Sequence, residues 1–288
     1  MLDNHPCSGP IGITPEIDNG GPRLRCLMFY EWEVPFDERC LFLSEMLLSE
    51  FGSMPVEGTG SLGKKEAHGA YKKVRTRLAG FLTGAGTDAP SIRVRSAPRV
   101  AEPDFFPSAL EASMGIVHAG QKIGLFAVDE QEIANIHALA NRAAPIVFGV
   151  LGAAYGGCWD FPAEYGAGGY VATVITVPRG VNVMANEEYG ARLNRWRDNI
   201  WHRKLRARQG YFREIYPINF LLDAHLGRSF RGARLSKFME ATGTLRPCAF
   251  NEKMYQWDVP DETIGEVRIA LEPSGLVLSS PAEPLPPD

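Results

Sequence analysis

The spacing of hydrophobic residues changes from a period of two to a period of about 3.6 within residues 24–51. The alternating positions are Leu24, Cys26, Met28, Tyr30, Trp32 and Val34. This alternation predicts a strand with one fully buried face that ends before Pro35. The helically spaced positions are Phe36, Cys40, Leu43, Leu47 and Phe51. They predict an amphipathic helix, with Asp37 as a capping residue and Gly52 at its end.

The same criteria predict further elements up to residue 177. Helical patterns cover Glu66–Leu82, after the glycine-rich turn Gly58–Lys65, and Asp129–Ala144, which ends before Pro145. The predicted strands are Ser91–Arg95, Met114–His118, Lys122–Val128, Ile146–Ala154 and Tyr170–Val177. The second and third of these are expected to form a hairpin through Ala119 and Gly120. The last two are apolar on both faces and are therefore expected in the interior of a sheet, separated by a glycine-rich loop, Tyr155–Gly169.

The C-terminal part begins with a long basic helix, expected over Asn186–Gln209 and ended by Gly210. Elements of a small strand–hairpin–helix–strand unit follow: Thr244–Phe250, Met254–Val259, Glu262–Leu271 and Gly275–Ser279. We therefore expect a flexible lead-in over residues 1–22, a main domain over 23–232, the small α/β unit over 233–279 and an extended, proline-rich tail over 280–288. Strands and helices alternate irregularly, which predicts an α+β fold with a mostly antiparallel central sheet flanked by helices. A ferredoxin-like core is one concrete version.

Composition narrows the class of protein. The chain has 288 residues, 45% of them hydrophobic, and a formal net charge of −4. These values are typical of a globular protein without a general affinity for nucleic acid or anionic membranes. The sequence contains neither an apolar run long enough to cross a membrane nor the pattern of a signal peptide. Five scattered cysteines without CxxC spacing favour reduced thiols, so we expect a cytoplasmic protein with no membrane contact.

The strongest local feature is the basic segment from Arg192 to Arg213. Eight basic residues stand against one acid, Asp198: Arg192, Arg195, Arg197, Arg203, Lys204, Arg206, Arg208 and Arg213. Trp196 and Ile200 lie on one side of the helix and are expected to be buried. Arg195, Arg203 and Arg206 lie off that side and are candidate contacts for an anionic partner. The alternative is that the charges are only solvated or are neutralised within the protein.

Two other segments carry candidate chemistry. Gly58, Gly63 and Lys64 fit part of a phosphate-binding loop, but Lys65 replaces the hydroxyl that would bind Mg²⁺, and no buried strand precedes the loop. The sequence therefore predicts no hydrolysis of nucleoside triphosphates. Cys158 lacks an adjacent histidine that could activate it as a nucleophile. Histidine and cysteine spacings match no metal motif, so neither a metal nor a cofactor is expected.

The glycine-rich loop also gathers aromatic and acidic residues. Among them, Trp159, Asp160 and Tyr165 are candidate partner-binding residues, because loops with this composition between rigid strands often form binding surfaces. The alternative is a loop that folds over the end of the sheet.

The order of elements resembles that of immunity proteins of bacterial type VI secretion toxin systems. The resemblance lies in the opening strand and helix, LRCLMFYEWEV and FDERCLFLSEML, the central strand pair and the smaller C-terminal unit. It implies a non-catalytic cytosolic protein that covers the surface of a toxin. The leading hypothesis is therefore a protein that binds a protein partner. Nucleic-acid binding through residues 192–213 and an enzyme with a site assembled from scattered residues remain open.

Overall fold

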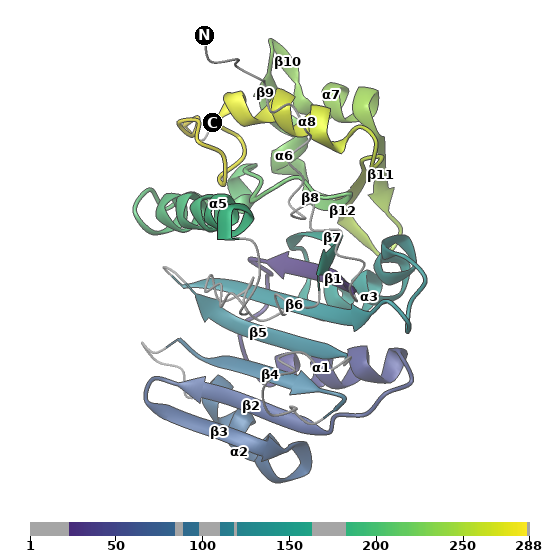
Figure 1. Cartoon of the computed structure of the whole chain (residues 1–288), viewed down its shortest axis with the longest axis vertical. Helices are drawn as coiled ribbons and strands as arrows, with labels where there is room; N and C mark the ends of the chain where they lie inside the picture. Colours follow the sequence, from purple (N-terminus) through teal and green to yellow (C-terminus); the bar gives the residue numbers. More distant parts are fainter. Residues whose placement is uncertain (1–22, 84–88, 98–109, 118–119, 163–182, 287–288) are drawn as a thin grey trace.

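In the part of the chain that the structure describes, ten strands form one antiparallel sheet at the centre of the fold (Figure 1). The computed structural model describes residues 23–83, 89–97, 110–117, 120–162 and 183–286. In spatial order the strands are β11 (Thr244–Cys248), β12 (Asn251–Asp258), β8 (Ile218–Leu222), β7 (Tyr155–Pro162), β1 (Arg23–Tyr30), β6 (Gln121–Asp129), β5 (Glu111–Val117), β4 (Ser91–Arg95), β2 (Glu57–Leu62) and β3 (Lys65–Ala70). A separate two-stranded ribbon is formed by β9 (Ser229–Phe230) and β10 (Ala233–Arg234).

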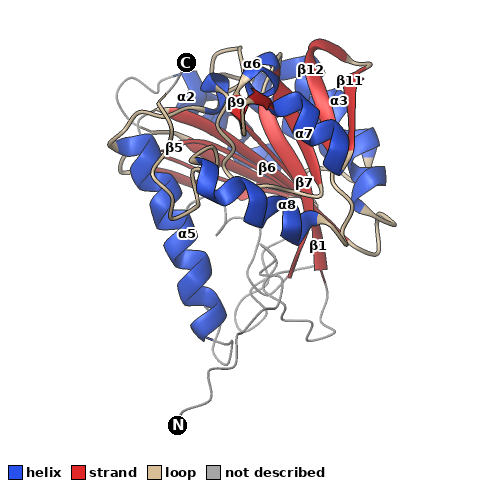
Figure 2. Ribbon diagram, turned by 90° about the horizontal axis from the view of Figure 1, so that it is seen from above, coloured by secondary structure: helices blue, strands red, loops and turns tan. Residues whose placement is uncertain are grey.

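Helices pack on both faces of the sheet (Figure 2). The described helices are α1 (Arg39–Glu50), α2 (Tyr71–Thr83), α3 (Ile136–Leu151), α5 (Val183–Trp201), α6 (Asp223–Gly227), α7 (Leu235–Thr242) and α8 (Ile264–Leu271). The first three cover one face, and buried residues of α5, α7 and α8 cover the other. An α+β fold with a large antiparallel sheet is thus confirmed, whereas a ferredoxin-like core is not.

Strand β1 lies in the middle of the sheet and separates two hydrophobic cores. It pairs with β6 on one side and β7 on the other. Leu27 and Phe29 point into the core under α1 and α3, whereas Cys26 and Met28 point into the core under α5. Both faces of the strand are therefore buried, where the sequence predicted one.

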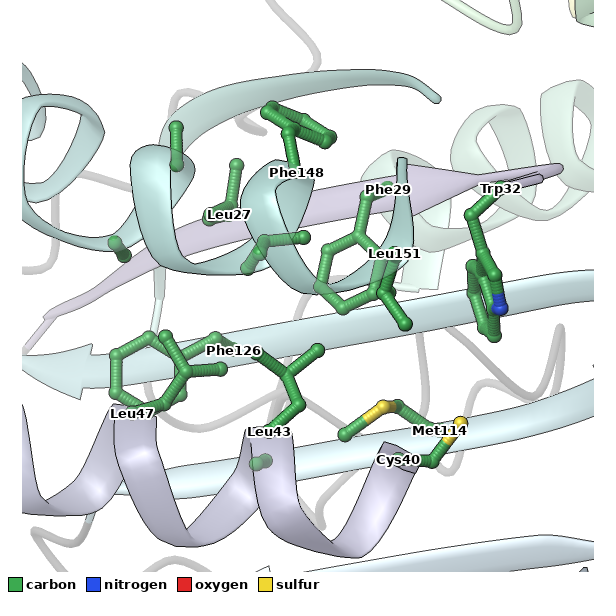
Figure 3. Close-up of a cluster of buried hydrophobic side chains, with 14 of the residues drawn as sticks. Leu27, Phe29, Trp32, Cys40, Leu43, Leu47, Met114, Phe126, Phe148 and Leu151 are labelled. Carbon is green, nitrogen blue, oxygen red and sulfur yellow. The ribbon is translucent and has the colours of Figure 1, made fainter. Parts of the chain in front are cut away.

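The first core is packed between α1, α3 and the sheet (Figure 3). Phe29 reaches across β6 above Gly124, where a Cβ atom would overlap the phenyl ring, so that position requires glycine. Trp32 packs on Phe29 with ring centroids 5.6 Å apart, and Cys40 and Leu43 of α1 belong to the same core. Trp32 therefore lies on the opposite face from Met28, because the strand ends at Tyr30 and Glu31 adopts a positive φ of 54°. The alternation predicted through Val34 is wrong after Tyr30.

Several predicted elements are confirmed. The helical stripe from Phe36 to Phe51 is buried, and its middle residues lie along α1. The N-cap residue of α1 is Glu38 and not Asp37, although the Asp37 carboxylate accepts a hydrogen bond from the Arg39 N–H at 3.0 Å. Strand β4 matches Ser91–Arg95, and β5 and β6 pair as the predicted hairpin strands. β1 and this hairpin share one sheet, as expected from their buried faces.

The largest error concerns residues 146–154. Ile146–Leu151 belong to α3, which continues through Pro145, so a strand over Ile146–Ala154 is wrong. An apolar run of this length does not distinguish a buried helix from a buried strand. Proline usually ends a helix, which is why the sequence predicted an end before Pro145. The first residues of the predicted Tyr155–Gly169 loop instead form β7. Tyr170–Val177 and the lead-in over residues 1–22 lie outside the described residues.

Smaller errors arise at glycine-rich and C-terminal segments. The hairpin of β2 and β3 includes Gly58–Lys65 and continues to Ala70, so helix α2 begins only at Tyr71. Helix α3 begins at Ile136, and Asn135 caps it. Helix α5 ends at Trp201, not Gln209. The predicted strand Gly275–Ser279 makes only an isolated parallel bridge, between Val277 and Phe212. The two strands β11 and β12 of the predicted C-terminal unit extend the main sheet through β8.

Candidate functional site

The arginines of α5 are largely bound within the protein. Arg192 donates to Glu214 Oε2 at 2.6 Å and to Glu272 Oε1 at 2.6 Å. Glu214 is buried beside Ser279 and Arg268. Burial raises the pKa of the Glu214 carboxyl. Arg192, Arg268 and the hydrogen bonds together lower it by more than burial raises it, so the pKa of Glu214 lies below the usual value. This buried network joins α5 to Glu214, to α8 and to the residues that follow α8.

Residues 275–280 run beside α5 and receive its polar side chains. Arg195 Nε donates to the Ser279 carbonyl at 2.9 Å, and Asn199 Nδ2 donates to the Leu278 carbonyl at 2.8 Å. Leu278 is itself buried and its N–H donates to the Phe212 carbonyl at 2.8 Å. Arg195, predicted to contact a partner, therefore holds the C-terminal segment against the second core.

Arg213 is the most deeply buried basic residue of the segment. Its guanidinium lies 3.9 Å from the centroid of the Trp196 ring and donates to Tyr30 Oη at 2.7 Å. Trp196 and Ile200 are buried, as the helical pattern predicted. The cation therefore stabilises the packing of α5 on β1 through its aromatic neighbours.

Glu31 fixes the chain that follows α5. The Glu31 carboxylate accepts hydrogen bonds from the backbone N–H groups of Ala207 at 3.0 Å and Arg208 at 3.1 Å, at the start of η2 (Ala207–Gln209). Gln121 Nε2 donates to the same carboxylate at 3.0 Å. This role could not be predicted from local sequence patterns, because Glu31 follows β1 and lies far from residue 207 in the chain. A buried carboxylate that binds consecutive amides orients the turn between α5 and η2.

What remains on the outside is a short surface at the end of α5. We call it the α5-end surface; its exposed members are Trp201, His202, Arg203, Lys204 and Arg208. The Trp201 side chain is 50% exposed. Arg208 pairs with Glu31 but keeps 65% of its side chain exposed. Burial lowers the pKa of the Lys122 ammonium, and the neighbouring Arg208 lowers it further.

Two of the predicted contact residues in this region have different environments. Arg203 is exposed and forms an ion pair with Glu283 of the C-terminal segment, with Nη2 and Oε2 3.1 Å apart. Arg206 is half-buried, and its Nη1 donates to the carbonyls of Ile200 at 3.1 Å and Leu205 at 2.8 Å. Arg203 is thus available at the surface, whereas Arg206 closes the turn after α5.

Two of the aromatic and acidic candidates, Trp159 and Asp160, lie on strand β7. Trp159 is buried on β7 and stacks on Tyr216, with ring centroids 4.7 Å apart. Asp160 is half-buried, and its Oδ1 lies 3.9 Å from Arg25 Nε. Burial raises the pKa of the Asp160 carboxyl, against the opposing effect of Arg25. Tyr165 lies outside the described residues. The structure therefore gives Trp159 a packing role.

The other candidate chemistry is accounted for by the fold. Cys158 is buried on β7, and burial raises the pKa of its thiol well above the usual value, which opposes formation of the thiolate. Gly63 and Lys64 form the turn between β2 and β3, so Gly58 does not precede a helix as a phosphate-binding loop requires. Within the described residues, no three histidine, cysteine, aspartate or glutamate side chains gather as a metal site.

Comparison with known proteins gives no relative: no family model, no curated protein and no solved structure matches this chain. Among the helices that the structure describes, none has the length and hydrophobicity needed to cross a membrane.

Proposed function

We propose that this protein is non-catalytic and binds a protein partner through the α5-end surface. The observation that carries the proposal is the exposed Trp201 beside the exposed cations Arg203, Lys204 and Arg208. Tryptophan and arginine dominate the binding energy of protein interfaces, and a half-exposed tryptophan offers a large apolar area to a partner.

The chemistry of this surface favours an acidic partner. The net charge of the chain is −4, yet this end of α5 presents three exposed basic residues within residues 203–208. A cationic patch on an acidic protein steers a partner of opposite charge to one place and suppresses other orientations. In its specific form, the proposed function is that of an immunity protein of the bacterial cytoplasm that neutralises a toxin, in keeping with the opening strand and helix, β1 and α1.

The arrangement of arginines favours a compact protein contact over nucleic acid. Of the eight basic residues between 192 and 213, only Arg203, Lys204 and Arg208 are exposed. Arg192, Arg195 and Arg213 direct their guanidinium groups to partners within the protein. Nucleic-acid binding depends on many simultaneous phosphate contacts, which this surface supports less well than one compact contact.

The test uses the full chain as bait in an extract of its native host, followed by measurement of the affinity for the captured protein. Trp201→Ala should weaken binding by roughly 30-fold or more, as expected for an interface tryptophan. The double substitution Arg203→Glu and Lys204→Glu should slow association, most strongly at low salt. If the captured protein is a toxin, its production alone should arrest growth, and co-production of this chain should restore it.

A matched control is available on α2. Lys72 and Lys73 are exposed, and reversing both charges changes the net charge by the same amount in another part of the molecule. This control variant should bind the partner nearly as well as the unaltered chain. Equal losses for the two double variants would contradict the proposed site, and affinity for DNA or RNA lost on reversal at residues 203 and 204 would favour nucleic-acid binding instead.

A further inference from the structure

The C-terminal segment after Ser280 occupies a row of hydrogen-bond donors next to the α5-end surface. The Glu283 carboxylate pairs with Arg203, the Leu285 carbonyl accepts from the Tyr211 hydroxyl, and the Pro286 carbonyl accepts from Arg228 Nη2 at 2.9 Å. We call residues 281–286 the tail. Three donors from different parts of the chain thus bind one acid side chain and two main-chain carbonyls of an extended, proline-rich segment.

The donors beneath the tail are held in place by the second core. Tyr211 and Arg228 are buried, and the Arg228 guanidinium lies 5.0 Å from the centroid of the Tyr211 ring. Gly275 has a φ of 69°, and a Cβ atom there would overlap the Glu283 carbonyl oxygen. The Leu285 N–H donates to the Gly275 carbonyl at 3.1 Å. The residues that bind the tail are therefore held in place by the rest of the fold.

The tail itself is attached much less firmly than the residues before it. Leu276, Val277 and Leu278 are buried, whereas Pro281, Glu283, Leu285 and Pro286 are exposed. Glu283 and Arg203 keep 79% and 45% of their side chains exposed, and an ion pair so exposed to water contributes little to stability. Residues 281–286 therefore bury far less of their surface than residues 276–280.

We propose that Arg203, Tyr211 and Arg228 form a peptide-binding site, and that the tail is an internal occupant which an acidic, proline-containing segment of the protein partner displaces. Extended proline-rich peptides lose little conformational entropy on binding, and their exposed carbonyls suit donors of this kind. The carboxylate of such a segment takes the place of Glu283 on Arg203. This inference rests on the proposed function, since it names the part of the partner that binds beside Trp201.

The test offers the full chain a competing peptide in trans. The probe is a fluorescein-labelled peptide with the sequence of residues 280–288, SPAEPLPPD. Glu283→Ala in the chain weakens the competing tail, and because Glu283 is exposed this change spares the core. The peptide should bind this variant roughly two- to fivefold more tightly than the unaltered chain, the range expected for loss of one surface ion pair. A probe with alanine in place of its glutamate should bind the Glu283→Ala chain roughly two- to fivefold more weakly than the unaltered probe, because it lacks the carboxylate that pairs with Arg203.

Two controls locate the binding. With both Arg203→Ala and Glu283→Ala in the chain, the two probes should bind equally, because no guanidinium remains to distinguish them. A nitroxide on the probe should broaden the amide NMR signals of residues near Tyr211 and Arg228 and leave those near Lys72 unchanged.

Failure to bind the Glu283→Ala chain at millimolar probe, or binding that ignores Arg203, would overturn the inference. These outcomes are separate from the proposed function. A captured partner whose affinity depends on Trp201 and Lys204 would still support protein binding at the α5-end surface, even if the probe does not bind.

Discussion

The two tryptophans of α5 provide a matched pair that separates stability from binding. Trp196 is 1% exposed and lies under the Arg213 guanidinium, whereas Trp201, on the same helix, is 50% exposed. Burying a tryptophan removes about 150–250 Å² from water, which at roughly 25 cal/mol per Å² is worth about 4–6 kcal/mol. Measured truncations of buried aromatic residues cost about 3–5 kcal/mol. We therefore expect Trp196→Ala to lower the free energy of unfolding by about 4 kcal/mol.

Trp201→Ala should lower the free energy of unfolding by about 2 kcal/mol, half the value for Trp196→Ala, because the Trp201 side chain is half-exposed in the native state. Urea unfolding followed by far-ultraviolet circular dichroism measures both values, provided that the slope against urea concentration is the same for the three proteins. In the binding assay, Trp201→Ala should cause a large loss of affinity, although it lowers stability less than Trp196→Ala does. Similar destabilisation by both substitutions would refute the orientation of α5, and with it the assignment of the α5-end surface.

Three further predictions concern single residues. Glu31→Ala leaves two backbone N–H groups without their carboxylate and should destabilise the protein by about 3 kcal/mol in the same urea assay, whereas an unchanged midpoint would show that Glu31 does not hold the turn. Burial lowers the pKa of His225 to about 4, so the unfolded chain takes up the proton first; stability should fall as the pH drops from about 6.5 to 4, and His225→Gln should flatten that slope in unfolding curves measured across this range. Lys64→Ala should leave stability and partner binding nearly unchanged, and Mg²⁺-dependent nucleotide turnover that this substitution abolished would contradict the hairpin assignment.

The local spacing of apolar residues predicted the helices that bury only one face. The stripe of α1 and the pair Trp196 and Ile200 have helical spacing, and both are buried as expected. The alternation in β1 predicted a strand, but not that its other face is equally buried, because this depends on α1 and α3 packing on one side and α5 on the other. Residues 146–151 were misassigned because an apolar run fits a buried helix and a buried strand equally well.

The candidate site was harder to predict because it depends on partners distant in the chain. The excess of arginines in residues 192–213 was visible, but their partners Glu214, Glu272, Ser279 and Glu283 lie 22 to 84 residues away in the sequence. Spacing within a helix says which residues share a face, and it does not say which distant carboxylate meets them. Helical spacing places Trp201 near the apolar residues of the helix. It cannot be distinguished from a core residue by spacing alone, because this requires knowing that α5 ends at Trp201.

The position of β1 in the sheet has a consequence for synthesis of the protein. β1 comprises residues 23–30, yet its neighbours β6 and β7 comprise residues 121–129 and 155–162, and α5, which covers one of its faces, ends at residue 201. At typical translation rates of about 5–20 residues per second, roughly 5 to 20 s pass between the emergence of β1 and that of its first partner strand. During this interval a segment with two apolar faces has no native partner. The nascent chain is therefore expected to need chaperone protection of residues 23–30, and its folding should be completed only late in translation.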